Sequence, residues 1–296
     1  MSLRLQMLQV ARLAPRLLEE SAGLVREFFL KQFAGGGAPD RAGKPDLYYT
    51  IFALAGAEAM GAPLPPADPR YPALREWIES FGQGEALDFI HLGALIRCRA
   101  ALGLRGKSAP LLARLEAHRT ADGGYHETPG AKYGHAYGCF VALGAYQDAG
   151  VDLPEPLRMV QCLKFLETPD GAWGNVRGMR EGTVPATAAA VTLLHQLGMP
   201  VNQAAGDWLF ARQHESGGWL AVPGAPLPDL LSTATALHAL SCVDRPLSDP
   251  ARDLCLDFLD TLWNADGGFH GHWADDDLDA EYTFYALLAL GHLAIR

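Results

Sequence analysis

The four-residue stretch SGGW at 216–219 has close copies at regular distances along the chain: DGGY at 122–125, DGAW at 170–173 and DGGF at 266–269. The aromatic residues that end these copies are separated by 48, 46 and 50 residues. A glycine-rich turn that recurs with such a period is typical of helix-pair repeats. Continued toward the N-terminus, the same spacing reaches two weaker glycine clusters, at 81–84 and 35–37. We therefore count six repeats.

A second motif follows the turns. Residues 46–54, 229–237 and 279–287 share the pattern D-x-x-x-T-x-x-A-L. The first position of this motif is occupied in the six repeats, in order, by Asp46, Asp88, His135, Thr183, Asp229 and Asp279. Aspartate before a helix accepts a hydrogen bond from a free backbone N–H of the first turn. The four aspartates are therefore predicted to be N-caps.

Each repeat has two kinds of helix. The segments at 186–194 and 287–293 are apolar on all sides, which predicts helices buried in an inner layer, whereas 254–259 is amphipathic and suits an outer layer. An open stack of such repeats needs a polar end, but 284–295 stays apolar. We therefore predict an all-α fold, a closed (α/α)6 barrel of six helix-pair repeats, in one domain over 1–296 with residues 1–14 as a loose N-terminal arm.

Composition limits the partners and the compartment. The formal charge of −10 argues against nucleic acid as a partner, because nucleic acid attracts basic surfaces. The five cysteines form no CxxC pair, which fits a reducing compartment. We see no signal-peptide pattern and no apolar run of the roughly 18 residues that a spanning helix needs. We therefore expect a cytoplasmic protein without integral membrane insertion.

Over about residues 25–293, the repeated turn resembles those of squalene cyclases, which are terpene cyclases, and of protein prenyltransferase β subunits. The spacing is most similar to that of the Rab-type geranylgeranyltransferase β subunit. Related thioester domains carry a Gly-Cys-Gly-Glu-Gln signature that is absent here. The resemblance implies a central cavity that binds an isoprenoid or another lipid-like molecule, and a helical partner subunit.

The zinc site of the prenyltransferases is only partly matched. Asp229 corresponds to the family's aspartate ligand, but Leu231 stands in place of the cysteine and Tyr282 in place of the histidine. A single carboxylate cannot hold Zn²⁺, which needs three or four donors. Pro223 and Pro226 also replace the cations that bind diphosphate in the family. We therefore expect no metal cofactor, and ordinary protein prenylation is disfavoured.

Class II terpene cyclases protonate an alkene with the middle aspartate of D-x-D-D-T. Residues 279–283 (DAEYT) resemble this motif in part, so Glu281 and Asp279 are the candidate catalytic acids. Aromatic rings can stabilise carbocations by cation–π contact. The candidate substrate-binding residues are Tyr48, Tyr49, Phe52, Phe89, His135, Tyr137, Tyr282 and Tyr285.

Three functions stay open. The leading hypothesis is a zinc-independent, isoprenoid-handling protein that binds a prenyl chain or polycyclic lipid in its central cavity. The alternatives are a class II-like cyclase and a noncatalytic scaffold that binds a protein partner. His270 and His272, next to three aspartates at 275–277, form a weaker candidate for a metal site.

Overall fold

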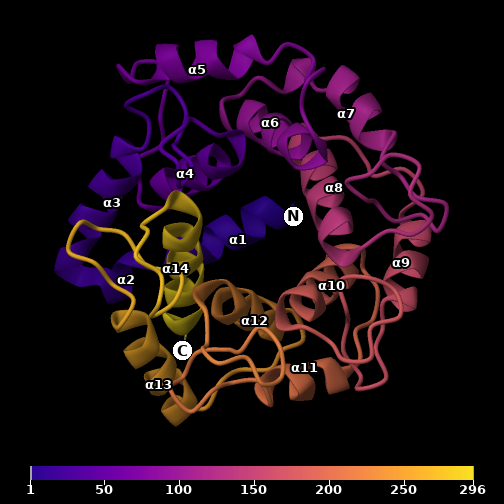
Figure 1. The fold of residues 1–296 in the computed structure, drawn as a ribbon. Helices are drawn as coiled ribbons and strands as arrows, with labels where there is room; N and C mark the ends of the chain where they lie inside the picture. Colours follow the sequence, from indigo (N-terminus) through magenta and orange to yellow (C-terminus); the bar gives the residue numbers. More distant parts are fainter. Residues whose placement is uncertain (1, 296) are drawn as a thin grey trace.

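The computed structural model describes residues 2–295 and consists of two concentric rings of helices (Figure 1). The inner ring is formed by α4 (Leu47–Ala59), α6 (Phe89–Ala101), α8 (Ala136–Ala149), α10 (Val184–Gln196), α12 (Leu230–Cys242) and α14 (Ala280–Leu293). The outer ring is formed by α3 (Ala22–Lys31), α5 (Tyr71–Ser80), α7 (Ala109–Glu116), α9 (Pro156–Phe165), α11 (Gln203–Phe210) and α13 (Asp249–Asp260). The predicted (α/α)6 barrel is therefore confirmed.

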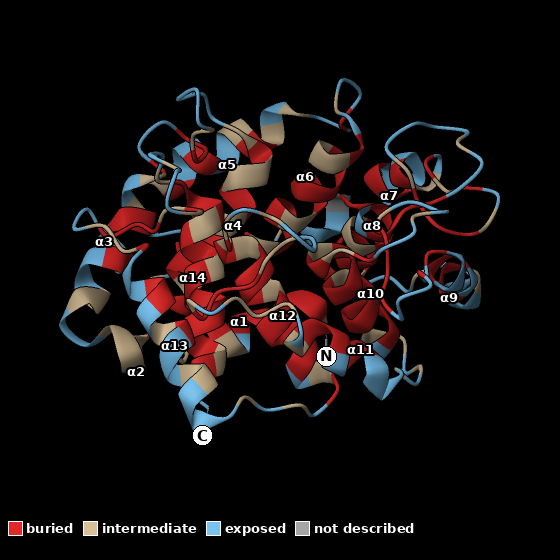
Figure 2. Ribbon diagram, turned by 60° about the horizontal axis from the view of Figure 1, so that its bottom comes forward, coloured by how far each residue is buried: buried red, intermediate tan, exposed pale blue. Residues whose placement is uncertain are grey.

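The shorter elements lie between these helices or before them: α1 (Leu3–Ala11), α2 (Pro15–Leu18) and the 3₁₀ turns η1 (Glu19–Ser21) and η2 (Arg105–Lys107). Buried residues concentrate in the inner ring, and exposed ones lie on the outer ring and its loops (Figure 2). No helix of the described part, residues 2–295, is long and apolar enough to cross a membrane.

Every inner helix begins after a residue whose side chain accepts a backbone N–H of the first turn: Asp46, Asp88, His135, Thr183, Asp229 and Asp279. The predicted caps are therefore confirmed. The threonine four residues later joins the cap to the turn. Thr233 donates to the Asp229 carbonyl oxygen at 2.7 Å and accepts the Trp219 backbone N–H at 2.9 Å. In the four repeats that have this threonine (Thr50, Thr187, Thr233 and Thr283), its hydroxyl accepts a backbone N–H of the turn, so the two sequence motifs are joined by hydrogen bonds.

The turn glycines permit close contact between repeats. Gly217 has a φ of +98°, and a Cβ there would lie 2.0 Å from the Leu254 carbonyl oxygen on α13. A Cβ on Gly267 would lie 2.3 Å from the Leu24 carbonyl oxygen on α3. Because Gly267 belongs to the last repeat and Leu24 to the first, this contact closes the ring, together with the packing of α14 against α4.

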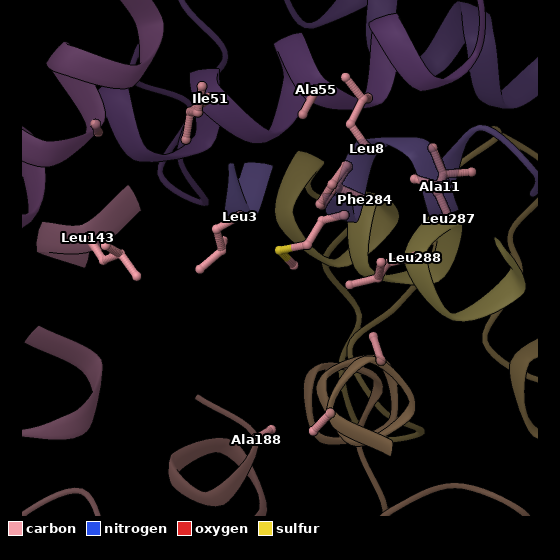
Figure 3. Packing of buried hydrophobic residues seen from close by; sticks show 14 of the residues in the cluster. Leu3, Leu8, Ala11, Ile51, Ala55, Leu143, Ala188, Phe284, Leu287 and Leu288 are labelled. Atoms are coloured by element: carbon pink, nitrogen blue, oxygen red, sulfur yellow. The ribbon is translucent and has the colours of Figure 1, made fainter. Parts of the chain in front are cut away.

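The N-terminal arm is not loose, contrary to expectation. Residues 3–11 form α1, which lies within the inner ring and packs against α14, α4 and α8 (Figure 1). Leu3, Leu8 and Ala11 are buried among inner-helix side chains (Figure 3). A Cβ on Gly291 would lie only 2.1 Å from the Val10 carbonyl oxygen. The expectation failed because a lumen bounded by apolar helices leaves room for one further apolar helix.

Ion pairs fix α1 to the C-terminal ends of inner helices. Arg4 binds Asp148 at 3.2 Å and Glu58 at 3.4 Å. Arg97 binds the second oxygen of Asp148 at 3.2 Å. Asp148 is buried, and the guanidinium groups of Arg4 and Arg97 balance its charge. The helix therefore blocks the end of the barrel opposite the caps.

Candidate functional site

A cavity of about 340 Å³ lies in the barrel. Its wall is mostly aromatic and aliphatic, and Met7 of α1 contributes to it. Its lining residues are Met7, Tyr48, Tyr137, Phe140, Asn175, Thr183, Pro185, Ala186, Ala188, Ala189, Thr192, Leu231, Thr235, His238 and Tyr285.

Whether a side chain of an inner helix faces the lumen depends on how many residues separate it from the N-cap. Tyr48, Tyr137 and Leu231 are each the second residue after their caps, and Tyr285 and His238 are the sixth and ninth after theirs. Intervals of three and four residues place side chains on one helix face. This register identifies Phe140 and His238 as neighbours of the cavity, and neither was predicted from the sequence.

The structure brings together some of the predicted substrate-binding residues. Tyr48, Tyr137 and Tyr285 line the cavity. Phe52 lies behind them, with ring centroids 5.1 Å from Tyr48 and 5.6 Å from Tyr285. Tyr49 lies outside, in a cleft at the mouth that Tyr48 and Tyr137 also line. The aromatic lining is therefore concentrated on α4, α8 and α14.

The other predicted substrate-binding residues lie elsewhere. Phe89 is fully buried and stacks on Tyr125 of the neighbouring turn at 6.4 Å. It is the first residue after its cap, a position that faces the outer layer. His135 caps α8 and pairs with Glu127, and Tyr282 lies in a side cleft. None of the three lines the central cavity.

Glu281 is one of two buried acids at the mouth, the other being Asp279. It lies in the first turn of α14, and its carboxylate accepts the Tyr48 hydroxyl at 2.5 Å. The pKa of Glu281 is raised to about 7, chiefly by burial; the Tyr48 hydrogen bond opposes this shift and the nearby Asp279 contributes to it. The carboxyl does not line the cavity itself, whereas Tyr48 does. Glu281 is therefore in direct contact with a residue of the cavity wall.

Asp279 has a different environment. It accepts the Tyr282 backbone N–H at 2.8 Å and the Arg41 side chain at 2.9 Å. Arg41 also binds Asp275 at 2.9 Å and lies 5.3 Å from the Tyr282 ring centroid. Burial raises the pKa of Asp279, and its bonds to Tyr282 and Arg41 act in the opposite direction. These bonds occupy the carboxylate in capping and ion pairing.

A cationic imidazole at the mouth was missed by sequence reasoning. His91 places one ring nitrogen 2.9 Å from Asp46 and the other 2.9 Å from Asp88. The hydrogen bond to Asp46 raises the pKa of His91 to about 9, with burial opposing it and Asp88 adding to it. Like Arg41, His91 is already paired with carboxylates. Asp46 and Asp88 occupy the same position of the aligned motif in neighbouring repeats. This alignment is the sequence signal that could have indicated that His91 lies between the two carboxylates.

The position that corresponds to the family's zinc site holds few ligands. Asp229 uses one carboxylate oxygen for the Ser232 backbone N–H and the other for the Ser232 hydroxyl, both at 2.7 Å. Leu231 and Tyr282 line a cleft together with Asp229 and His272. The His272 Nδ1 accepts the Ala274 backbone N–H at 3.1 Å. A neutral ring with Nδ1 so engaged carries its hydrogen on Nε2 and offers no lone pair to a metal.

A different cluster brings three metal-type ligands together: His126, Glu127 and His135. His126 Nδ1 accepts the Thr128 backbone N–H at 3.0 Å, and His135 Nδ1 accepts that of Gly138 at 2.8 Å. A ring that accepts a hydrogen bond at Nδ1 carries its hydrogen at Nε2 and has no free lone pair there. These bonds argue against a metal at this cluster and favour a structural role at the rim.

At the candidate metal site, the ring nitrogens of His270 and His272 also make hydrogen bonds within their own loop. His270 Nδ1 lies 3.1 Å from the Asp277 carbonyl oxygen and its Nε2 lies 3.3 Å from Asn264. His272 holds its own loop through Ala274. Among the described residues, 2–295, the two histidines belong to no group of three metal-type ligands.

Solved structures with the same overall fold include two enzymes of known class. Protein geranylgeranyltransferase-I from Candida albicans, complexed with GGPP, matches with a TM-score of 0.70 and 15% identity over 90% of this chain and 89% of that chain. A variant of the type II terpene cyclase MstE from Scytonema, in complex with geranylgeranyl dihydroxybenzoate, matches with a TM-score of 0.61 and 15% identity over 95% and 97%. A protein from Actinoplanes matches with a TM-score of 0.61 and 18% identity over 93% and 98%.

No curated protein matches the sequence. The model of the prenyltransferase alpha-alpha toroid domain matches residues 15–93 and 184–295. These two segments contain both ends of the ring and the inner helices α4, α10, α12 and α14. The chain therefore belongs to the prenyltransferase alpha-alpha toroid domain family.

Proposed function

We propose that the protein binds an uncharged isoprenoid or polycyclic lipid in its central cavity and does so without zinc. The observation that carries this proposal is the cavity wall, which combines three tyrosines and a phenylalanine with aliphatic residues and contains no Asp, Glu, Lys or Arg. Sites for apolar ligands are concave, mostly apolar and supplied with few polar groups. The two enzymes of similar fold are complexed with geranylgeranyl compounds, which supports the ligand class.

The size of the cavity favours a small member of that class. A cavity of roughly 150 Å³ holds benzene, which corresponds to about 25 Å³ per carbon atom. At that density, 340 Å³ accommodates about fourteen carbon atoms. Met7 contributes to the wall because α1 fills the opposite end of the barrel.

Charge at the mouth argues against a diphosphate ligand. The two cations there, Arg41 and His91, are engaged by carboxylates of Asp279, Asp275, Asp46 and Asp88. A diphosphate would have to displace these partners in a region rich in acidic groups, which repel anions. Zinc independence is supported by Leu231 and Tyr282, which supply neither a thiolate nor an imidazole.

The test is a binding titration of the purified protein with farnesol and with farnesyl diphosphate, followed by intrinsic fluorescence. Farnesol should bind and the diphosphate should bind at least tenfold more weakly. Ala189→Phe, which fills the cavity, should abolish binding, while Ala113→Phe, at an exposed position of the outer helix α7, should preserve it. Native mass spectrometry with denaturing lipid extraction identifies any molecule carried through purification. Binding of the diphosphate alone would refute the proposal.

A class II-like cyclase is the second candidate, and the Tyr48 to Glu281 hydrogen bond favours it. Since burial raises the pKa of Glu281 to about 7, this carboxyl retains a proton near neutral pH. Glu281 would break its carboxyl O–H bond and give the proton to a substrate alkene, forming a C–H bond and a carbocation, and the Tyr48 hydroxyl would hydrogen-bond the carboxylate left behind. Glu281→Gln should abolish cyclisation of linear isoprenoids while ligand binding persists. Full activity of that variant would exclude this mechanism.

The scaffold hypothesis has weaker support. Leu157 and Phe165 are exposed on the outer helix α9, but Arg177 lies 4.5 Å from the Phe165 ring centroid and covers it in part. A helical partner subunit remains a prediction. Pull-down with purified candidate subunits, compared between the wild type and Leu157→Glu, would test it.

A further inference from the structure

The strongest unexplained feature is a buried histidine pair at the wall of the cavity. His238 lies on α12, lines the cavity and is 3% exposed. Its Nδ1 lies 3.0 Å from Nε2 of His292 on α14. Its own Nε2 is buried and has no hydrogen-bond partner within the described chain.

A buried polar atom without a partner is unfavourable, because folding removes its bonds to water and replaces them with none. The neighbouring polar side chain on α12 does not share this condition. Thr235 donates its hydroxyl to the Leu231 carbonyl oxygen at 2.7 Å. Of these two cavity-lining residues, His238 is therefore the one with a polar atom that lacks a hydrogen-bond partner.

The histidine pair is uncharged. Burial lowers the pKa of His238 to about 4, with His195 adding to the shift, and burial also lowers the pKa of His292 well below its ordinary value. A neutral imidazole binds its partner by a hydrogen bond rather than by charge. A charged partner would lie in a buried cavity whose lining offers no Asp, Glu, Lys or Arg to balance it, so an uncharged polar group is favoured as the partner of Nε2.

The hydrogen bond between His238 and His292 also limits which polar group can pair with His238 Nε2. If His238 donates from Nδ1 to His292, its Nε2 is an acceptor. If His292 donates from Nε2, then His238 carries its hydrogen on Nε2 and is a donor. A hydroxyl can donate and accept, so it satisfies both tautomers, whereas a ketone or an ether satisfies only the second.

We infer that the ligand of the central cavity carries a hydroxyl group at its deep end and that His238 Nε2 binds this hydroxyl. This inference rests on the proposed function and narrows the ligand class to prenyl alcohols or hydroxylated terpenoids. His238 lies eight residues into α12, which is about 12 Å below the start of that helix. The apolar part of the ligand therefore extends from His238 toward Tyr48 and the mouth.

The experiment compares farnesol with farnesene, which has the same fifteen-carbon skeleton and no hydroxyl. Isothermal titration of the wild type should give about tenfold or greater preference for farnesol, the ratio expected for loss of a buried hydrogen bond. His238→Leu should bind both compounds with equal affinity. His214→Leu, which changes a histidine outside the cavity lining, is the matched control and should keep the preference.

The outcomes separate the two proposals. Equal binding of farnesol and farnesene by the wild type overturns the hydroxyl inference, since an ordered water would then satisfy Nε2, and leaves the cavity function standing. Binding of neither compound overturns both. Because the wild-type comparison needs no variant, the test holds even if His238→Leu fails to fold, which its melting temperature reveals.

Discussion

The hydroxyl of Tyr48, in the first turn of α4, lies 2.5 Å from the carboxylate of Glu281, in the first turn of α14. The two residues are 233 positions apart in the sequence. Their helices belong to the first and last repeats, so this bond crosses the closure of the ring. Closure of the barrel therefore places Glu281, a carboxyl group with a raised pKa, in hydrogen-bonding contact with the aromatic wall of the cavity.

The stability of the fold should depend on pH through Glu281. Its pKa is about 7 in the folded protein against an ordinary value of 4.5, so the folded state binds this proton more tightly. The contribution is complete below pH 4.5 and is lost as pH rises through about 7, with a maximum of about 3 kcal/mol. Denaturant unfolding between pH 4.5 and 7 should show this decline in the wild type. The idea fails if Glu281→Gln declines equally.

His91 should influence the stability of the fold in a higher pH range than Glu281 does. Its pKa is about 9 in the folded protein against an ordinary value of 6.5, so its stabilising effect is complete below pH 6.5 and is lost as pH rises through about 9. Thermal melting of the wild type should show this loss, and His91→Gln should not. Glu281→Gln is the matched control and should retain it. An unchanged profile in His91→Gln would show that Asp46 and Asp88 do not hold the imidazolium.

The inserted helix should depend on Asp148. Asp148→Ala leaves Arg4 and Arg97 without their shared buried carboxylate and should destabilise the fold by about 3 to 5 kcal/mol. Arg12→Ala removes a more exposed pair with Glu58 and should cost at most about 1 kcal/mol. Limited proteolysis near residues 3–11 should accelerate in the first variant only. Equal resistance of both variants would contradict the anchoring role.

The turn aromatics should be major packing elements. Trp219 is fully buried, and its indole N–H donates to the Leu209 carbonyl oxygen at 2.8 Å. Trp219→Ala and Trp173→Ala should each destabilise the protein by about 3 to 5 kcal/mol. Trp219→Phe, which keeps most of the ring volume, should cost less. Unchanged melting temperatures in both alanine variants would refute the packing role.

The protein should contain no stoichiometric zinc. Elemental analysis of the wild type after zinc dialysis should give far less than one zinc per chain. The double variant Leu231→Cys, Tyr282→His adds a thiolate and an imidazole to the cleft of Asp229 and should bind about one zinc. Zinc in the wild type that disappears in Asp229→Ala would contradict the expectation.

Local chemistry made the fold predictable from the sequence. The glycine turns, the aspartate caps and the following threonines act within about fifteen residues of one another, so their spacing reveals six repeats directly. Closure also followed from the sequence, because the apolar helix at 284–295 needed cover. Tyr48, Tyr137 and Tyr285, which were selected from this pattern, line the cavity.

Tertiary structure alone decided the contents of the barrel. The insertion of α1, the pairing of His238 with His292 and the position of His91 between two caps join residues from different helices. Phe89 was misplaced because a cap identifies where a helix begins, and only the ring geometry shows which side of that helix faces inward. The sequence determined each repeat through short-range bonds and periodicity, whereas the cavity and its polar atoms depend on contacts between residues far apart in the chain.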